Sequence, residues 1–118
     1  MLRLWVSHAL ADQPTANAVK GAELFQTRCS MCHELQVGES TKYGPNLQGV
    51  FGRKAGSLPG YNYSVDLRVS SIVWDAQTLG EYLADPHRGG RGTKMPYPGL
   101  SSKTDRDNLI AYLEQVTR

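Results

Sequence analysis

Apolar residues recur every three or four positions in three segments of this chain, which is the spacing of an amphipathic helix. The first segment begins after Asn17, a favourable N-cap, and runs to about Arg28. Leu24 and Phe25 lie on its apolar face, and Gly21 on the same face has no side chain to keep another helix away. We therefore predict an N-terminal helix that a second helix can approach closely.

The second segment has its cap at Asp75 and runs to about Ala84. Leu79 and Tyr82 fall on one side of it, together with Leu83, and Pro86 disfavours its continuation. The pattern predicts a short helix with one buried face.

The third segment begins near Ser102, whose spacing to Asp105 fits a capping box, and continues to about Val116. We expect its apolar stripe to contact the first helix, with the Phe25 ring against Leu109 or Tyr112. The full predicted stripe is Leu109, Tyr112, Leu113 and Val116.

No sustained period occurs between Gly38 and Ser71, where glycine, proline and polar residues dominate. We predict loops and tight turns there. No alternating or continuous β-branched run is long enough to build a sheet. The expected fold class is therefore all-α, with three to five short helices and crossed N- and C-terminal helices.

The composition indicates one small domain that is rich in loops. The chain has 118 residues, of which 12 are glycine and 6 are proline. Its mass is 13.0 kDa and its mean hydropathy is −0.43. Chains divide into several domains only well above this length. The apolar core is modest, and a bound cofactor would help to fill it.

The formal net charge is only +2, but the charges are unevenly distributed. No acidic residue occurs from Ser40 to Val65 or from Pro86 to Thr104. Nucleic acid is disfavoured as a partner because aromatic interleaving and a docking motif are missing. We expect a basic face for an acidic protein partner. The basic residues of the two stretches are Lys42, Arg53, Lys54, Arg88, Arg91, Lys94 and Lys103.

The candidate chemistry lies in the run Cys29-Ser30-Met31-Cys32-His33, which has the spacing CxxCH. Two thiols three positions apart can bond to the two vinyl groups of one haem, and the adjacent histidine can ligate its iron. Haem also requires a second axial ligand well downstream, and Met95 is available in the run Thr93-Lys94-Met95-Pro96. A zinc site or a redox dithiol also uses CxxC. Both alternatives are disfavoured, because the chain has only these two cysteines and no run that predicts a βαβ unit.

Further motifs share a family pattern with CxxCH. The chain contains GPNL at 44–47, FGRK at 51–54, TKMPYPG at 93–99 and LIAYL at 109–113, together with the lone Trp74. In this order and spacing, residues 17–118 resemble the class I c-type cytochromes, most closely the mitochondrial proteins and their bacterial relatives. The resemblance implies a compact fold around one covalently bound haem c.

The resemblance also implies a role for individual residues. Cys29 and Cys32 would form thioether bonds to the haem, His33 would be the proximal ligand of the iron, and Met95 would be the distal ligand. The carbonyl of Pro45 would orient the His33 ring. Further cofactor-binding residues are implied at Arg53, Tyr63 and Trp74, near the haem propionates, and at Tyr82 and Thr93, near the methionine.

Some positions depart from the family pattern. Leu67 stands where many relatives have an asparagine, and Glu23 and Ser101 stand where mitochondrial members often have lysines of the docking surface. Gly89 and Gly90 replace bulkier residues before the methionine segment. The partner therefore cannot simply be carried over from the family.

The expected function is electron transfer by a monomer that is not an enzyme, with a cytochrome reductase, an oxidase or a dehydrogenase as partner. The alternatives are a tethered or excised haem domain of a larger oxidoreductase or membrane-anchored cytochrome, and a ligand-binding or peroxidase-like haem protein. We expect a periplasmic or mitochondrial intermembrane location. Residues 1–16 form an extension, which we interpret as a leader remnant or a linker; no run of 18 apolar residues occurs, so any membrane tether would be a missing anchor.

Overall fold

The computed structural model describes residues 16–39, 43–88 and 93–118. Its regular elements are the helices α2 (Ala18–Arg28), α3 (Val65–Val69), α4 (Ala76–Ala84) and α5 (Lys103–Thr117). The described residues contain one isolated antiparallel bridge, between Lys54 and Val73, and no longer strand. The all-α prediction is confirmed. No helix in these ranges combines the length and the apolar character that a membrane crossing needs.

The three predicted helices form with the predicted caps. The Asn17 side chain accepts hydrogen bonds from the backbone of Val19 and Lys20 at the start of α2. Asp75 and Thr78 form a capping box at the start of α4. The Ser102 hydroxyl accepts from the Asp105 backbone at 3.2 Å at the start of α5. Side-chain oxygens at these positions satisfy N–H groups that have no partner within the helix.

Two details of the sequence prediction were wrong. The segment predicted as loops contains α3, a single turn whose cap is Ser64, with the Ser64 side chain accepting from the Leu67 backbone. One turn is too short to show a helical period in the sequence. Val116 is not buried, because 37% of its surface is exposed. Ile110 lies in the core instead, since α5 also packs against α4.

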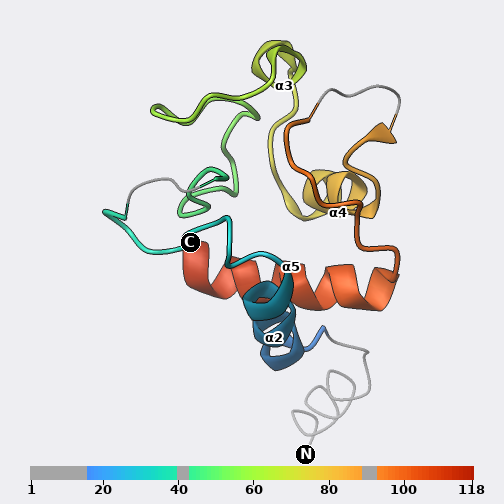
Figure 1. The fold of residues 1–118 in the computed structure, drawn as a ribbon. Helices are drawn as coiled ribbons and strands as arrows, with labels where there is room; N and C mark the ends of the chain where they lie inside the picture. The colour runs from blue at the N-terminus through green and yellow to red at the C-terminus, as the bar shows by residue number, and fades with distance from the viewer. Residues whose placement is uncertain (1–15, 40–42, 89–92) are drawn as a thin grey trace, which may run out of the picture.

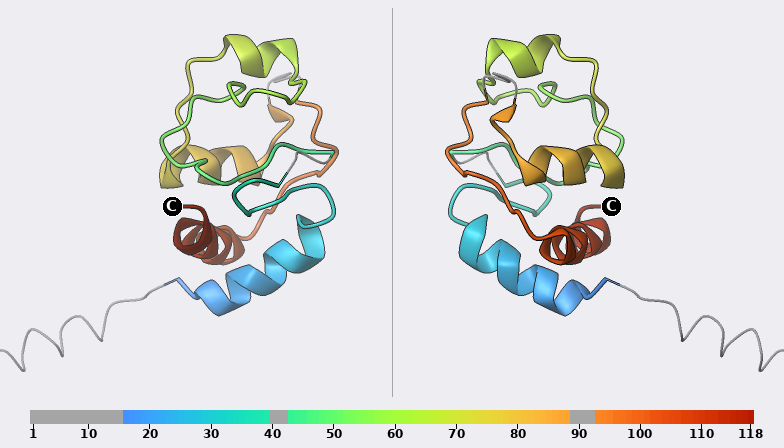
Figure 2. Two further views of the ribbon diagram at one scale, coloured as in Figure 1. Left: turned by 90° about the vertical axis from the view of Figure 1, so that its left-hand side faces the viewer. Right: turned by 90° about the vertical axis from the view of Figure 1, so that its right-hand side faces the viewer.

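Helix α5 lies between α2 on one side and α4 on the other (Figures 1 and 2). α2 crosses α5, as Figure 1 shows, so the predicted crossing of the terminal helices is confirmed. A Cβ atom on Gly21 would lie 1.9 Å from the carbonyl oxygen of Asn108, which shows that only glycine permits this approach. The predicted ring contact is also present, with the Phe25 and Tyr112 centroids 6.0 Å apart.

The core has two parts. The first lies at the α2–α5 crossing and contains Phe25, Leu100, Leu109 and Leu113. The second extends from α4 and α5 to α3 and the loops, and contains Val50, Ala55, Tyr63, Leu67, Trp74, Leu79, Tyr82 and Ile110. Most candidate site residues belong to the second part or to the segments around it.

Candidate functional site

The CxxCH run folds into a turn at the end of α2. The backbone N–H of Cys29 donates to the Phe25 carbonyl at 2.9 Å, and those of Cys32 and His33 donate to the Cys29 carbonyl at 3.1 and 3.0 Å. Both cysteines are partly buried free thiols. Burial raises the pKa of the Cys29 thiol to about 11, so it is protonated at neutral pH. The end of α2 thus holds both thiols beside His33.

The His33 ring is held in place by the loop that contains Pro45. Its Nδ1 atom lies 2.7 Å from the Pro45 carbonyl oxygen. A carbonyl can only accept, so Nδ1 carries the proton and the Nε2 lone pair is left for a metal. Burial lowers the pKa of His33, although the bond to Pro45 opposes this, and the neutral imidazole is the form that ligates metals.

Gly44 completes this support, a role that its place in the sequence does not predict. A Cβ atom at Gly44 would lie 2.6 Å from His33 Cε1 and 2.9 Å from both ring nitrogens. The Gly44 N–H also donates to the Cys32 carbonyl at 2.8 Å. Glycine therefore allows the backbone to lie directly against the imidazole. In the sequence, Gly44 belongs to the GPNL motif, but a glycine before a proline also fits an ordinary turn.

Met95 is held near α4. The hydroxyls of Tyr82 and Thr93 share a hydrogen bond. The Thr93 oxygen also accepts from the Met95 backbone at 3.2 Å. Met95 is partly buried and packs against the second part of the core. The structure thus brings together three residues that the resemblance implied.

Arg53 and Trp74 are brought together by backbone pairing. The N–H of Trp74 donates to the Arg53 carbonyl at 2.9 Å, next to the Lys54–Val73 bridge. The Arg53 guanidinium donates to the carbonyls of Asn46 and Gln48 at 3.0 and 3.2 Å. Burial lowers the pKa of Arg53 because a charge is costly away from water. An anion placed here would relieve that cost.

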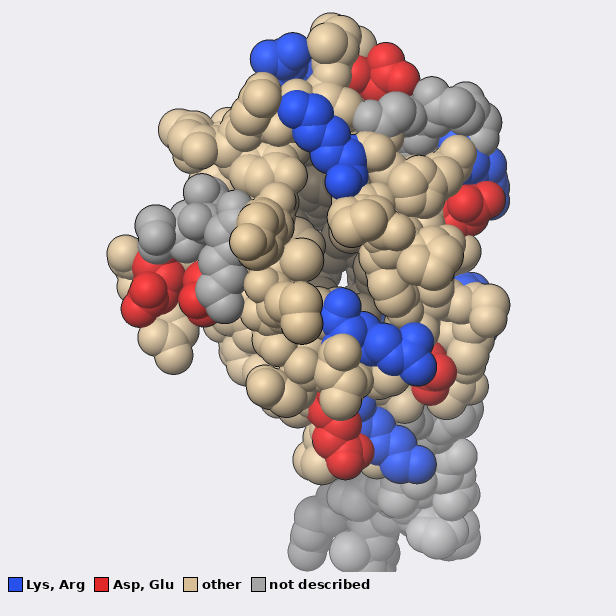
Figure 3. Space-filling model, viewed as in Figure 1, with Lys and Arg blue, Asp and Glu red and all other residues tan. Residues whose placement is uncertain are grey.

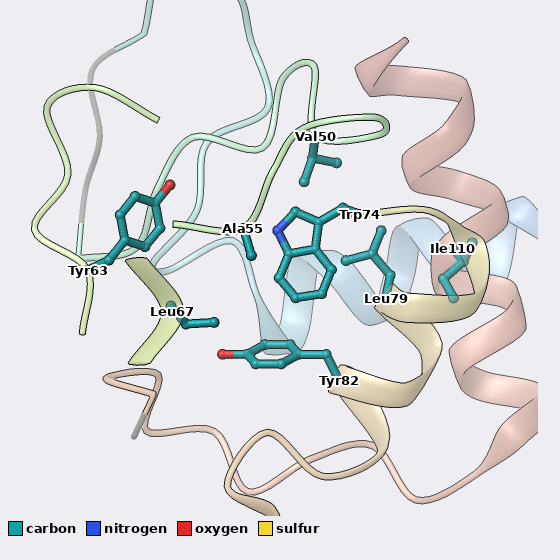
Figure 4. Packing of buried hydrophobic residues seen from close by; sticks show 8 residues of the cluster. All are labelled: Val50, Ala55, Tyr63, Leu67, Trp74, Leu79, Tyr82 and Ile110. Carbon is teal, nitrogen blue, oxygen red and sulfur yellow. The ribbon is translucent and has the colours of Figure 1, made fainter. Parts of the chain in front are cut away.

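The aromatic candidates Tyr63, Trp74 and Tyr82 are buried in the second part of the core (Figure 4). The Trp74 and Tyr82 rings meet edge to face with centroids 5.2 Å apart. The Tyr82 hydroxyl points away from α4 and toward Leu67 (Figure 4). Tyr63 comes from the loop before α3 and packs edge to face on Tyr61 at 4.8 Å. Burial raises the pKa of Tyr63, so its hydroxyl stays protonated and can donate.

One face of the molecule is hollowed at its centre, and Lys and Arg side chains lie above and below the hollow (Figure 3). The acidic side chains in this view lie mostly farther out. The basic side chains of Arg28, Arg88 and Lys94 are exposed. Lys42 and Arg91 of the basic stretches, the Gly89-Gly90 pair and most of the 1–16 extension lie outside the described residues.

The described residues do not form a cluster of side chains that could bind a metal ion such as zinc. No group of three or more His, Cys, Asp or Glu side chains there could hold a metal ion. A zinc site built on the two cysteines is therefore not supported. The donors that are present, two thiols, one neutral imidazole and one thioether, match the attachment and ligation of a c-type haem.

Comparison with known proteins places the chain in a family. The family model for cytochrome c matches residues 18–117. A cytochrome c of Cochliobolus lunatus is 49% identical over 102 residues, which are 86% of this chain and 94% of that protein. A cytochrome c of Arabidopsis thaliana is 48% identical over 102 residues, which are 86% of this chain and 91% of that protein.

These findings favour neither alternative, the haem domain of a larger oxidoreductase or the peroxidase-like protein. The family carries covalently bound haem c, and the two cysteines that thioether attachment needs are present here. The chain therefore belongs to the cytochrome c family and is a single-haem electron carrier.

Proposed function

We propose that Cys29 and Cys32 attach the haem and that His33 and Met95 are the axial ligands of its iron. The observation that carries this assignment is the His33–Pro45 contact at 2.7 Å, because it fixes the tautomer that presents Nε2 to a metal. Met95 is the distal candidate because it is partly buried among the core aromatics. A haem with these two ligands exchanges one electron between ferrous and ferric iron with little rearrangement.

The surrounding residues would tune that exchange. We assign Arg53, Tyr63 and Trp74 to the haem propionates, because a half-buried cation and two buried groups with N–H or O–H donors suit carboxylates. Tyr82 and Thr93 hold the Met95 segment through their shared hydrogen bond and the bond to the Met95 backbone. Apolar packing around the site disfavours the additional charge of the ferric state.

We further propose that residues 17–118 form the haem domain and that the protein acts as a monomeric carrier rather than an enzyme. Its partners would be a reductase, an oxidase or a dehydrogenase with an acidic docking surface. The exposed cations Arg28, Arg88 and Lys94 would orient such a partner through weak, salt-sensitive contacts. We place the protein outside the reducing cytosol, in a mitochondrial intermembrane space or a bacterial periplasm.

Substitution of the two methionines tests the assignment of the distal ligand. Met95→Ala should remove the methionine signature from the ferric spectrum, lower the reduction potential and allow carbon monoxide to bind the ferrous protein. Met31→Ala is the matched control, because Met31 lies between the cysteines and is 82% exposed. An unchanged spectrum and potential in Met95→Ala would show that another residue is the ligand.

A further inference from the structure

The segment that carries Met95, residues 93–101, has no regular secondary structure and is held in place by individual contacts. Near its start, the Lys94 ammonium donates to the Asn62 carbonyl at 3.1 Å. Near its end, the Leu100 N–H donates to the Leu83 carbonyl at 2.7 Å. These contacts attach both ends of the segment, to the loop before α3 and to α4. Neither of these two contacts involves the middle of the segment.

Tyr97 supplies a contact in the middle. Its ring is partly buried and packs against the part of the core that contains Phe25 and Leu100. Its hydroxyl accepts a hydrogen bond from Arg28 Nη1 at 3.2 Å. Arg28 is the last residue of α2 and directly precedes Cys29. The bond thus joins the end of the helix that bears the cysteines to the segment that bears Met95, across 69 positions of sequence.

We propose that Arg28 and Tyr97 form a latch that keeps the Met95 segment closed over the site, with Tyr97 as a positioning residue for the distal ligand. The inference rests on the proposed ligand role of Met95. The latch would act on the frequency with which the segment opens. The cation is the donor and the phenol oxygen the acceptor, so a phenylalanine at position 97 would preserve the ring packing and lose the bond.

The expected effect is moderate because the bond lies at the surface. A net hydrogen bond of ordinary strength changes an opening equilibrium by about two- to tenfold. Loss of the Tyr97 hydroxyl should therefore increase, by that factor, the opening of the whole segment, in which the contacts of Lys94 and Leu100 also break. The fold itself should persist, since the Tyr97 ring would remain in the core.

Tyr97→Phe in the holoprotein isolates the hydroxyl. We would measure the rate at which imidazole replaces the methionine ligand in the ferric protein, at saturating imidazole, where opening limits the rate. The second measurement is hydrogen exchange of the Leu100 amide, which reports the segment without reference to the iron. Both rates should rise about two- to tenfold in Tyr97→Phe. Tyr43→Phe is the control and should change neither rate, because Tyr43 is 84% exposed.

Arg28→Gln and the double variant test whether the two residues act together. Arg28→Gln should accelerate both processes about as much as Tyr97→Phe, and the double variant should be no faster than the faster single variant. Arg28→Lys should accelerate both processes less than Arg28→Gln does, since an ammonium can also donate to the phenol. Multiplication of the two single effects in the double variant would overturn the latch.

The outcomes separate the latch from the ligand assignment. A methionine signature in the wild-type spectrum with unchanged rates in Tyr97→Phe would overturn the latch alone. A wild-type ferric spectrum without that signature would overturn the role of Met95 and, with it, the latch.

Discussion

The crossing of α2 and α5 depends on Gly21, and replacing this residue with alanine tests how tightly the helices must pack. The added Cβ would lie 1.9 Å from the Asn108 carbonyl oxygen and 2.9 Å from Tyr112 Cβ. The first neighbour is helix backbone and cannot rotate away. Relief of the clash therefore requires α5 to move away from α2 by at least about 1 Å, since Cβ contacts shorter than 3.0 Å essentially do not occur.

This movement would weaken two interactions at the crossing. The Phe25 and Tyr112 rings would separate from their 6.0 Å contact. The Asn17 N–H would lose its 2.7 Å bond to Asn108 Oδ1. Overpacking costs about 1–3 kcal/mol and a lost hydrogen bond about 1 kcal/mol more. We therefore expect Gly21→Ala to lower the free energy of unfolding by about 2–4 kcal/mol and the melting temperature by roughly 10 °C.

Gly80→Ala provides a matched control on α4. The nearest atom to its added Cβ would be Ile110 Cδ1 at 3.6 Å, an ordinary contact. Because alanine is the better helix former, this variant should be more stable by about 0.5–1 kcal/mol. Thermal and urea unfolding of both ferric holoproteins, followed by circular dichroism, measures the difference. A loss below about 1 kcal/mol in Gly21→Ala, or equal changes in both variants, would refute the close-packing explanation.

Three further predictions concern the cofactor, acid stability and docking. Replacing Cys29 and Cys32 with alanine should leave an apoprotein without cooperative melting, because so small a core needs the porphyrin; native-like circular dichroism would contradict this. Helix-cap hydrogen bonds, chiefly from the Thr78 backbone, lower the pKa of Asp75 in the folded protein below the unfolded value of 3.8. The ionised carboxylate therefore stabilises the fold above pH 3.8, and this stabilisation is lost as the pH falls through the pKa of the folded protein. Asp75→Asn should flatten that part of an acid-unfolding curve, and an unchanged curve would exclude the effect. Charge reversal of Arg88 and Lys94 to glutamate should slow electron transfer to an acidic partner by about tenfold at low salt, with the melting temperature nearly unchanged; a rate indifferent to both changes would remove them from the docking face.

The sequence predicted those parts of the fold whose causes are local. Asn17, Asp75 and Ser102 marked the starts of three helices because a cap acts on the next few residues. Helix α3 was missed because one turn leaves no period to detect. Val116 was misplaced because a second helix, α4, also packs on α5 and draws Ile110 into the core.

Only those residues of the candidate site whose spacing in the sequence forms a recognisable motif could be predicted. CxxCH and the methionine after Thr93-Lys94 indicated the donors, whose roles stay predictions here. The support of His33 by the Gly44 backbone and the Arg28–Tyr97 bond could not be found this way. Both contacts join segments that meet only in the folded chain, and no sequence motif includes both residues of either pair.

The hydrogen bond from Asn17 to Asn108 joins residues 91 positions apart. Forming the α2–α5 crossing therefore closes residues 17–108 into a ring, at a length-dependent entropic cost of about 4 kcal/mol. Every residue proposed to hold the haem, from Cys29 to Met95, lies within that ring. Once the crossing has formed, these segments search for one another with both ends tethered, which shortens the search. A cut in any of the intervening loops would open the ring and make the crossing an encounter of two fragments, with a rate that depends on their concentration.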